Sequence, residues 1–400
     1  MNRIPKNFCY VPFKELAIME QNAVSPCCAV YPKDHRKINN LENFDYHNDS
    51  YFADLRNQFL KGNKPDICSK CWKVEETGHT SFRQQWNLKY QGMPVSTDLE
   101  FMDIRLSNKC NLQCKMCNKE YSHKIAENEL DAINEGLIEA SDKHIDEISF
   151  YKNYNNLSYM QKVFPMIEKN KKTIKGLRLA GGEPMIMPEV IQIIDWLIDE
   201  KMFHVNLHIL TNLTTINTLL VKKLEKFNKC VVYASVDGVG PYLEYQRFPT
   251  SWKTIEKNIN KLSKSNITLV LNPCWSQLNV LGLYDFIDTM SKYQINHITF
   301  NQVVTPSCLS WDIVPLQYRK DLIKKLNSKN FVLPKNFSES YKKFFSNIEH
   351  TYRKMNNNEI IQLQEKIKLW DRNNKISYKE FCPWADEILT NEQKDTIIKI

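Results

Sequence analysis

The sequence predicts an α/β protein built around a parallel sheet, and two observations lead to this prediction. Strand-like runs alternate with amphipathic helical segments through the middle of the 400-residue chain. Alternation of this kind is typical of βαβ units, in which right-handed crossovers join parallel strands. The chain is also long enough, and at 42% hydrophobic residues apolar enough, to bury a large core.

Six strands are expected in this sheet, with helical segments between them. The strands are predicted at residues 101–106, 175–180, 205–211, 230–236, 267–272 and 297–303. The helical segments are predicted near residues 119–140, 188–201, 215–227, 252–265 and 280–293. Residues 141–165 are expected to be an insertion that borders the active site, and residues 315–375 to form charged amphipathic helices.

Composition narrows the classes of function. The formal net charge of +8 is modest and diffuse for this length, which argues against nucleic acid as a partner. No run of about 18 uninterrupted apolar residues is present, so no membrane span is expected. The first residues lack a secretion signal, and a cytoplasmic location is expected. In that compartment the twelve cysteines are expected to bind metal or do chemistry rather than form disulfides.

The central cysteine motif is CNLQCKMC, in which Cys110, Cys114 and Cys117 follow a predicted strand. Three thiolates with this spacing can hold three irons of a cubane 4Fe–4S cluster and leave the fourth iron without a protein ligand. An open coordination position of this kind separates a catalytic metal site from a closed structural one. The spacing also allows a zinc site, with His123 as a fourth ligand, or a set of buried free thiols.

A second motif, GGEP, ends the strand predicted at residues 175–180 and precedes a helix. Its glycines, Gly181 and Gly182, would let a ligand approach the backbone closely. Glu183 offers an acceptor for an ammonium group. Taken alone, the motif also fits a plain strand-to-helix turn.

Together the two motifs resemble the radical S-adenosylmethionine (SAM) superfamily. The resemblance implies that the sheet is a partial (β/α)6 TIM-like barrel, with its chemistry at the carboxyl ends of the strands. It also implies that the three loop cysteines hold a 4Fe–4S cluster, that SAM chelates the open iron, and that Gly181, Gly182 and Glu183 bind SAM. The glutamate would contact the SAM amino group. Met116 stands where an aromatic residue often packs on the adenine, and it could make a softer contact there.

Three further residues are candidate SAM contacts. Asn212 ends the third predicted strand, and Ser235 lies in an S-V-D-G element after the fourth, which resembles one seen in many members of the superfamily. Arg247 resembles the arginine that meets the SAM carboxylate in peptide- and sulfatase-modifying relatives. For Ser235 and Arg247 the alternatives are a capping or turn serine and a solvated charge. Residues 100–312 would form the barrel, and residues 313–400 a helical extension.

A second group of cysteines lies before the barrel, in residues 1–99. A close pair combined with two more distant cysteines can form a four-thiolate site, which suits zinc and a fully ligated iron–sulfur cluster about equally well. The segment resembles the twitch or SPASM accessory module, and this resemblance implies one auxiliary 4Fe–4S cluster. Its ligands would be Cys9, Cys27, Cys68 and Cys71.

The segment departs from the accessory-module pattern in several places. It precedes the barrel instead of following it, and Asn22 stands where glycine is expected. Cys28 is expected to be a non-ligand, although it could replace Cys27. Residues 381–393 resemble the opening of the same module, and their Cys382 is expected to be a remnant or a packing residue.

The resemblance implies a mechanism in which one electron from the reduced cluster splits SAM into methionine and a 5′-deoxyadenosyl radical, which removes hydrogen from the substrate. The expected substrate is a peptide or protein side chain, with a net oxidation or a cross-link as the outcome. The alternatives are dehydrogenation of a small polyol or amino sugar, and a non-catalytic zinc-binding module. An electron donor such as a flavodoxin or ferredoxin is the expected protein partner.

Overall fold

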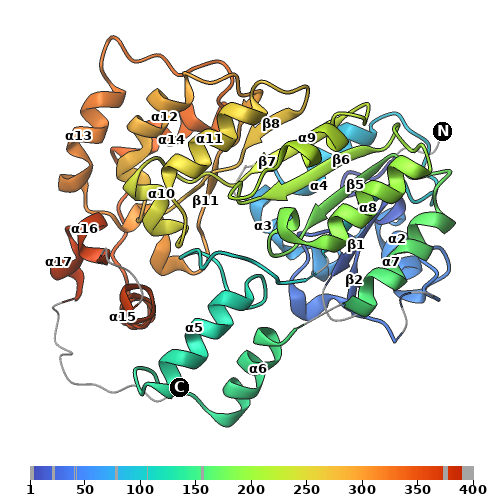
Figure 1. The fold of residues 1–400 in the computed structure, drawn as a ribbon, viewed down its shortest axis with the longest axis horizontal. Coiled ribbons are helices and arrows are strands. Elements are labelled where there is room, and N and C mark those ends of the chain that lie inside the picture. Colours follow the sequence, from blue (N-terminus) through green and yellow to red (C-terminus); the bar gives the residue numbers. More distant parts are fainter. Residues whose placement is uncertain are drawn as a thin grey trace.

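The computed structural model describes residues 4–19, 23–39, 41, 43–76, 80–105, 107–154, 157–372 and 377–389. Its centre is a nine-stranded sheet in the order β10-β8-β7-β6-β5-β4-β1-β2-β3. The strands from β4 to β10 are parallel and follow one another in chain order, as in the wall of a βα-barrel (Figure 1). The fold is therefore a mixed α/β fold with a parallel sheet, as the sequence predicts.

The six predicted strands are present in this sheet, although the last one is interrupted. They are β4 (Phe101–Arg105), β5 (Gly176–Ala180), β6 (Asn206–Thr211), β7 (Cys230–Ala234), β8 (Thr268–Leu271) and β10 (His297–Ile298). Leu106, predicted to end the first strand, lies outside the described residues.

The prediction of one continuous strand over residues 297–303 is wrong. Asn301–Gln302 forms a separate strand, β11, which pairs with β9 (Cys274–Trp275) in a two-stranded sheet. Pro273 lies between β8 and β9 on the neighbouring segment. Because proline donates no backbone N–H, the hydrogen-bond ladder breaks at this position.

The N-terminal segment continues the sheet beyond β4. β1 (Glu15–Met19) pairs in parallel with β4, and β2 (Ala23–Ser25) and β3 (Arg36–Lys37) follow in antiparallel pairing. All five residues of β1 are buried, so the run lacks the alternation that marks a half-exposed strand. For this reason the sequence pattern does not predict β1. The border predicted after residue 99 therefore falls within one hydrogen-bonded sheet.

Helices cover one face of the sheet, and on the other face Trp86 packs against Phe101 with ring centroids 5.6 Å apart. The covering helices are α8 (Pro188–Asp199), α9 (Thr218–Leu224), α11 (Trp252–Leu262) and α12 (Leu283–Met290). They share a hydrophobic core with strand residues such as Leu207 and Ile209. The alternate residues of β6, Asn206, His208 and Leu210, are only half-buried. We infer that this half-buried face corresponds to the barrel interior.

The remaining helices lie before, within and after this core. The N-terminal helices are α1 (Val11–Lys14), α2 (Ser50–Leu60), α3 (Ser69–Glu76) and α4 (Phe82–Tyr90). The helices between strands also include α5 (His123–Asn134), α6 (Asp142–Lys152), α7 (Leu157–Lys169) and α10 (Pro241–Gln246). The C-terminal helices are α13 (Leu316–Leu326), α14 (Ser340–Ile348), α15 (Asn357–Arg372), α16 (Tyr378–Phe381) and α17 (Ala385–Leu389). Across the described ranges, no helix combines the length and apolarity that a bilayer crossing requires.

Candidate functional site

The three motif cysteines lie in the loop that follows β4, at the carboxyl edge of the sheet. Cys110 is buried, and Cys114 and Cys117 are half-buried. Burial, and next the neighbouring Cys114 thiol, raise the pKa of Cys110 to about 12, and burial raises the pKa values of the other two thiols as well. Thiols in such surroundings ionise only when a bound cation takes up the charge. The donor set therefore fits an iron–sulfur cluster.

A zinc site fits the same residues less well. Among the residues that the structure describes, no group of three or more His, Cys, Asp or Glu side chains converges on one ion position. His123, the expected fourth zinc ligand, instead faces the backbone N–H of Cys110 with its Nδ1 atom, over 3.2 Å. A cubane cluster needs less convergence, because each of its irons takes its own thiolate.

The GGEP turn packs directly against the cysteine loop. Gly181 has a φ of +113°, a conformation that favours glycine. A Cβ at Gly182 would lie 2.2 Å from the carbonyl oxygen of Lys109. The backbone N–H groups of Gly182 and Glu183 donate to the carbonyl oxygens of Ser107 and Lys109, both over 2.8 Å. The close approach that the sequence predicts at Gly182 is thus made by the chain's own cysteine loop.

Glu183 is fully buried, and its carboxylate is held at the end of β6. Its Oε1 accepts hydrogen bonds from the Thr211 hydroxyl over 2.7 Å and from the Met185 N–H over 2.9 Å. Its Oε2 accepts one from the Asn212 N–H over 2.6 Å. Burial raises the pKa of Glu183, and these hydrogen bonds oppose the rise. Because each carboxylate oxygen can accept two hydrogen bonds, an ammonium group could still be bound.

Asn212 links β6 to the cysteine loop. Its Nδ2 lies 3.9 Å from the Cys110 sulfur and donates to the Asn111 Oδ1 over 2.9 Å. Its Oδ1 accepts from the Thr214 hydroxyl over 2.7 Å. The next residue, Leu213, is buried with a φ of +62°, a strained conformation for a branched side chain. Strain of this kind is concentrated at functional sites.

Arg247 reaches the same loop from the end of α10. Its Nη1 lies 3.6 Å from the Cys114 sulfur, and its Nε donates to the Asp237 Oδ2 over 2.6 Å. Asp237 is fully buried, and its Oδ1 accepts from the Cys274 N–H over 2.8 Å. Asp237 is not among the residues predicted from the sequence to belong to the site. Its place in the S-V-D-G element was the available signal.

Two other predicted residues lie at the edge of this network. Met116 is half-buried, and its sulfur accepts a long hydrogen bond of 3.9 Å from the Gln246 Nε2. Ser235 is half-buried at the end of β7, where its N–H donates to the Thr211 carbonyl oxygen over 2.8 Å. Their predicted contacts with SAM remain predictions.

Lys115, between the second and third motif cysteines, ties the loop to the C-terminal helices. Its N–H donates to the Gln246 carbonyl oxygen over 2.8 Å, and its side chain is buried. Its Nζ lies 5.1, 5.5 and 5.8 Å from the ring centroids of Tyr245, Phe248 and Trp370. Trp370 belongs to α15 and is 255 residues away in the sequence, so no local motif could predict this contact.

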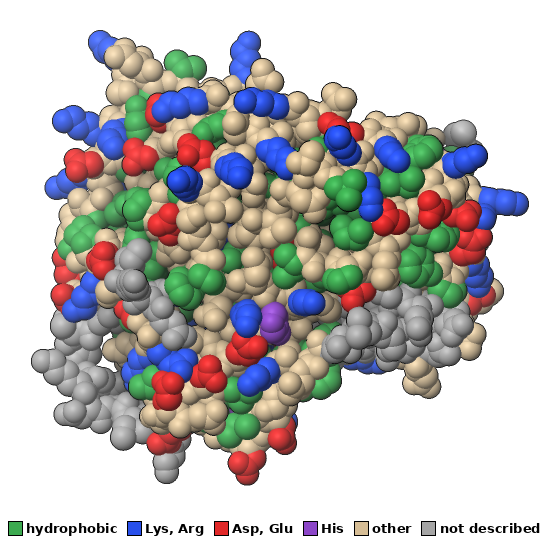
Figure 2. Space-filling view, in the orientation of Figure 1, with side chains coloured by type: hydrophobic (Ala, Val, Ile, Leu, Met, Phe, Trp, Pro, Cys, Tyr) green, Lys and Arg blue, Asp and Glu red, His purple; other side chains and the backbone are tan. Residues whose placement is uncertain are grey.

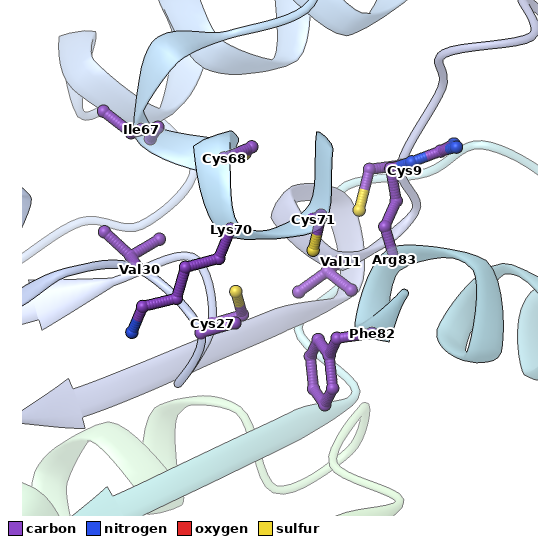
Figure 3. A pocket seen from close by; sticks show the side chains of 11 residues that line it. Cys9, Val11, Cys27, Val30, Ile67, Cys68, Lys70, Cys71, Phe82 and Arg83 are labelled. Atoms are coloured by element: carbon purple, nitrogen blue, oxygen red, sulfur yellow. The ribbon is translucent and has the colours of Figure 1, made fainter. Parts of the chain in front are cut away.

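The four predicted auxiliary cysteines line one cavity beside β1. It holds about 330 Å³ of empty space and is also lined by Lys70 and Arg83; its thiols are those of Cys9, Cys27, Cys68 and Cys71. Figure 3 shows the sulfur atoms of Cys9, Cys27 and Cys71 around a common space. Burial raises the pKa of Cys68 to about 12, so these thiols too would ionise only with a bound cation. Among the described residues these thiols do not converge on a single ion position, so the donor set fits a cubane cluster, in which each iron takes its own thiolate, better than one zinc ion.

Two further cysteines lie outside that lining. The Cys28 sulfur is 3.7 Å from the Arg178 Nη1, which in turn lies 3.0 Å from the Asp103 Oδ2. Cys382 is fully buried, and its thiol contacts the carbonyl oxygen of Gln277 at 3.9 Å, an arrangement that suits packing. The last four residues of the segment at 381–393 lie outside the described residues.

The site thus consists of a parallel sheet in an α/β fold, a three-cysteine loop at the carboxyl edge of that sheet, and a buried carboxylate behind the loop. Residues 104–281 match the family model described as Radical SAM superfamily. This part of the chain is therefore similar to the radical SAM superfamily.

The comparisons also identify individual relatives. The chain is 24% identical over 284 residues to the radical SAM cyclopropyl synthase TigE of Paramaledivibacter caminithermalis, covering 69% of this chain and 56% of that protein. It is 25% identical over 198 residues to a probable GTP 3′,8-cyclase of Methanocaldococcus jannaschii, covering 48% of this chain and 55% of that protein. The chain thus spans little more than half the length of these curated relatives. The structure of Streptococcus suis SuiB bound to its precursor peptide SuiA aligns with a TM-score of 0.39 at 14% identity, over 68% of this chain and 61% of that one.

Proposed function

We propose that this chain is a radical SAM enzyme whose cluster is held by Cys110, Cys114 and Cys117. When bound, the cluster and SAM supply a 5′-deoxyadenosyl radical that removes hydrogen from a substrate. The observation that carries the proposal is the network around the cysteine loop. Asn212 contacts the Cys110 sulfur and Arg247 contacts the Cys114 sulfur, so the predicted SAM residues surround the predicted cluster ligands.

The chain's own residues would bind and orient SAM. Glu183 presents a carboxylate for the SAM ammonium group, and Thr211 and Asn212 hold that carboxylate in one orientation. Asp237 fixes the Arg247 guanidinium through Nε and leaves Nη1 beside the Cys114 sulfur, where the guanidinium would bind the SAM carboxylate. Groups held in this way keep reacting atoms at near-contact distance.

We further propose a peptide or protein side chain as the substrate, with a net oxidation or a cross-link as the outcome. The resemblance of residues 1–99 to an accessory module of peptide-modifying enzymes supports this choice. The half-buried face of the sheet offers polar contacts for such a substrate, among them Arg178, His208 and Tyr233. The second group of cysteines would hold an auxiliary 4Fe–4S cluster that accepts an electron from the substrate, and the four-thiol cavity supports this assignment.

Anaerobic reconstitution tests the proposal. Iron and sulfide are counted per chain, and 5′-deoxyadenosine is measured after addition of SAM and dithionite. We expect about eight irons per chain, the number for two cubane clusters, together with 5′-deoxyadenosine. Zinc in place of iron, with no SAM cleavage, would refute the proposal and identify a binding module.

A further inference from the structure

An open groove lies beside the cysteine loop, between residues 214–217 and the exposed side of α11. It spans about 800 Å³, part of which is open to solvent, and Lys253 and Lys257 line its α11 side. Both lysines are exposed. No Asp or Glu stands among the described residues that line it. The groove is therefore positively charged and wide enough to receive part of another protein.

Among the described residues, these two lysines have no partner that would explain them within the fold. In the part of the chain that the structure describes, neither Lys253 nor Lys257 forms an ion pair or a hydrogen bond. Lys261 follows at the same spacing of four, so three like charges share one side of α11. Two nearby carboxylates accept hydrogen bonds from other groups: Glu256 of α11 from a tyrosine hydroxyl, and Glu244 of the neighbouring helix α10 from a backbone N–H. Figure 2 shows Lys and Arg side chains over the region where Figure 1 draws α9 and α11.

The groove reaches the cluster ligands through very few side chains. Thr214 lines the groove, and its hydroxyl contacts both Asn111 Nδ2, over 2.8 Å, and Asn212 Oδ1, over 2.7 Å. The Asn212 Nδ2 lies 3.9 Å from the Cys110 sulfur. One asparagine therefore separates the groove wall from a predicted cluster thiolate, which makes a short route for an electron.

We propose that this groove is the docking surface for an acidic electron-carrier protein that reduces the cluster at Cys110, Cys114 and Cys117. The inference rests on the proposed function, because only a chain that holds this cluster needs such a partner. One electron passes from the reduced carrier to the oxidised cluster, and no covalent bond between the proteins forms or breaks. Electron-transfer partners form small, transient interfaces, so a groove of this size with two unpaired lysines is large enough for such a complex. Unpaired charges at the rim of an interface mainly accelerate association.

The test compares two reductants on the reconstituted full chain. Lys253→Glu and Lys257→Glu are combined, and cluster reduction is followed by its visible absorbance with a reduced flavodoxin and, separately, with dithionite. At low ionic strength, where screening is weak, we expect the double variant to be reduced about tenfold more slowly by flavodoxin. Reduction by dithionite should be unchanged, and added salt should remove the difference. Calorimetric titration with flavodoxin should show weaker binding without any turnover.

A matched variant carries the same charge change at another surface. Lys320 and Lys324 are exposed and four residues apart on α13, which lies at another edge of the molecule (Figure 1). Lys320→Glu with Lys324→Glu should leave both rates unchanged. Equal slowing in the two double variants, or slowing with dithionite as well as flavodoxin, would overturn the docking proposal. The proposal would also be overturned if the double variant at Lys253 and Lys257 were reduced by flavodoxin at the normal rate but no longer bound inorganic phosphate. That result would identify the groove as a small-anion site. Failure of the unmodified chain to bind iron would instead refute the proposed function.

Discussion

At the scale of single residues, Gly182 is the point where the two sequence motifs meet. Any side chain there would collide with the backbone of Lys109, which precedes the first motif cysteine. The neighbouring N–H groups already bind that backbone, so the loop cannot move without losing hydrogen bonds. Gly182 thus helps to position the cysteine loop, although it has no side chain that could bind the cluster.

Replacing Gly182 by Ala should displace the cysteine loop. Overpacking of this kind costs about 1–3 kcal/mol, and we expect that loss in the free energy of unfolding. Because the displaced segment carries Cys110, iron bound after anaerobic reconstitution should fall as well. Chemical denaturation and iron analysis measure the two effects.

Gly238→Ala is the comparison for that variant. An added Cβ at Gly238 would meet the Cβ of Tyr242 at 3.2 Å and the backbone nitrogen of Leu243 at 3.4 Å, a much milder approach than the 2.2 Å at Gly182. We expect a smaller loss of stability and near-normal iron content. If Gly182→Ala matched Gly238→Ala in both measurements, the close packing of the two motifs would not matter for the site.

At the scale of elements, β1 joins the N-terminal segment to the barrel strand β4 and carries a buried acid. Glu15 is 5% exposed, and its Oε1 accepts a hydrogen bond from the Tyr90 hydroxyl over 3.0 Å. Burial raises the pKa of Glu15 from 4.5 to about 7, and Lys89 is the main group that opposes the rise. The folded chain therefore holds this proton more tightly than the unfolded chain.

This pKa predicts how stability depends on pH. The pKa of Glu15 is higher in the folded chain than in the unfolded chain, so its ionisation lowers the free energy of unfolding. This loss is absent below about pH 4.5, grows up to about pH 7, and stays constant above it. The full cost is about 3 kcal/mol as an upper figure. Glu15→Gln keeps an oxygen for Tyr90 and removes the charge. Chemical denaturation of the metal-free chain measures the free energy of unfolding of both proteins. Between pH 5 and pH 8 this free energy should rise in the variant relative to the parent, and a constant difference across that range would contradict the pKa shift.

The elements also show what sequence can and cannot predict here. The strands from β4 to β8 are predicted well because each is a buried apolar run bounded by turns and followed by an amphipathic helix. The last predicted strand is broken because a proline on the neighbouring segment interrupts the hydrogen-bond ladder. This break depends on which segments pair and cannot be predicted from the residues of the strand alone. In the site, the cysteines and Glu183 are found from local motifs. The contact of Trp370 with Lys115 joins distant segments and leaves no local pattern. Asp237 lies in the S-V-D-G element, but that pattern does not show that it binds Arg247.

At the scale of the whole molecule, two groups of cysteines share one sheet. The first follows β4, and the second surrounds a cavity beside β1, the strand that pairs with β4. The auxiliary cavity includes Cys68 and Cys71, which come from a short segment at the start of α3. No side-chain hydrogen bond that the structure describes joins these two residues to the motif loop, so the two metal groups should assemble independently.

Cys68→Ala combined with Cys71→Ala tests that independence. We expect the iron content to fall from about eight to about four per chain, since one cubane is lost. SAM cleavage with dithionite should persist in part, because the motif loop and its contacts with Asn212 and Arg247 are untouched. Cys230→Ala removes a buried thiol from β7, away from either group, and should keep the full iron content. Complete loss of SAM cleavage in the double variant would mean that the auxiliary group supports the first site, and an unchanged iron content would mean that these two thiols bind no cluster.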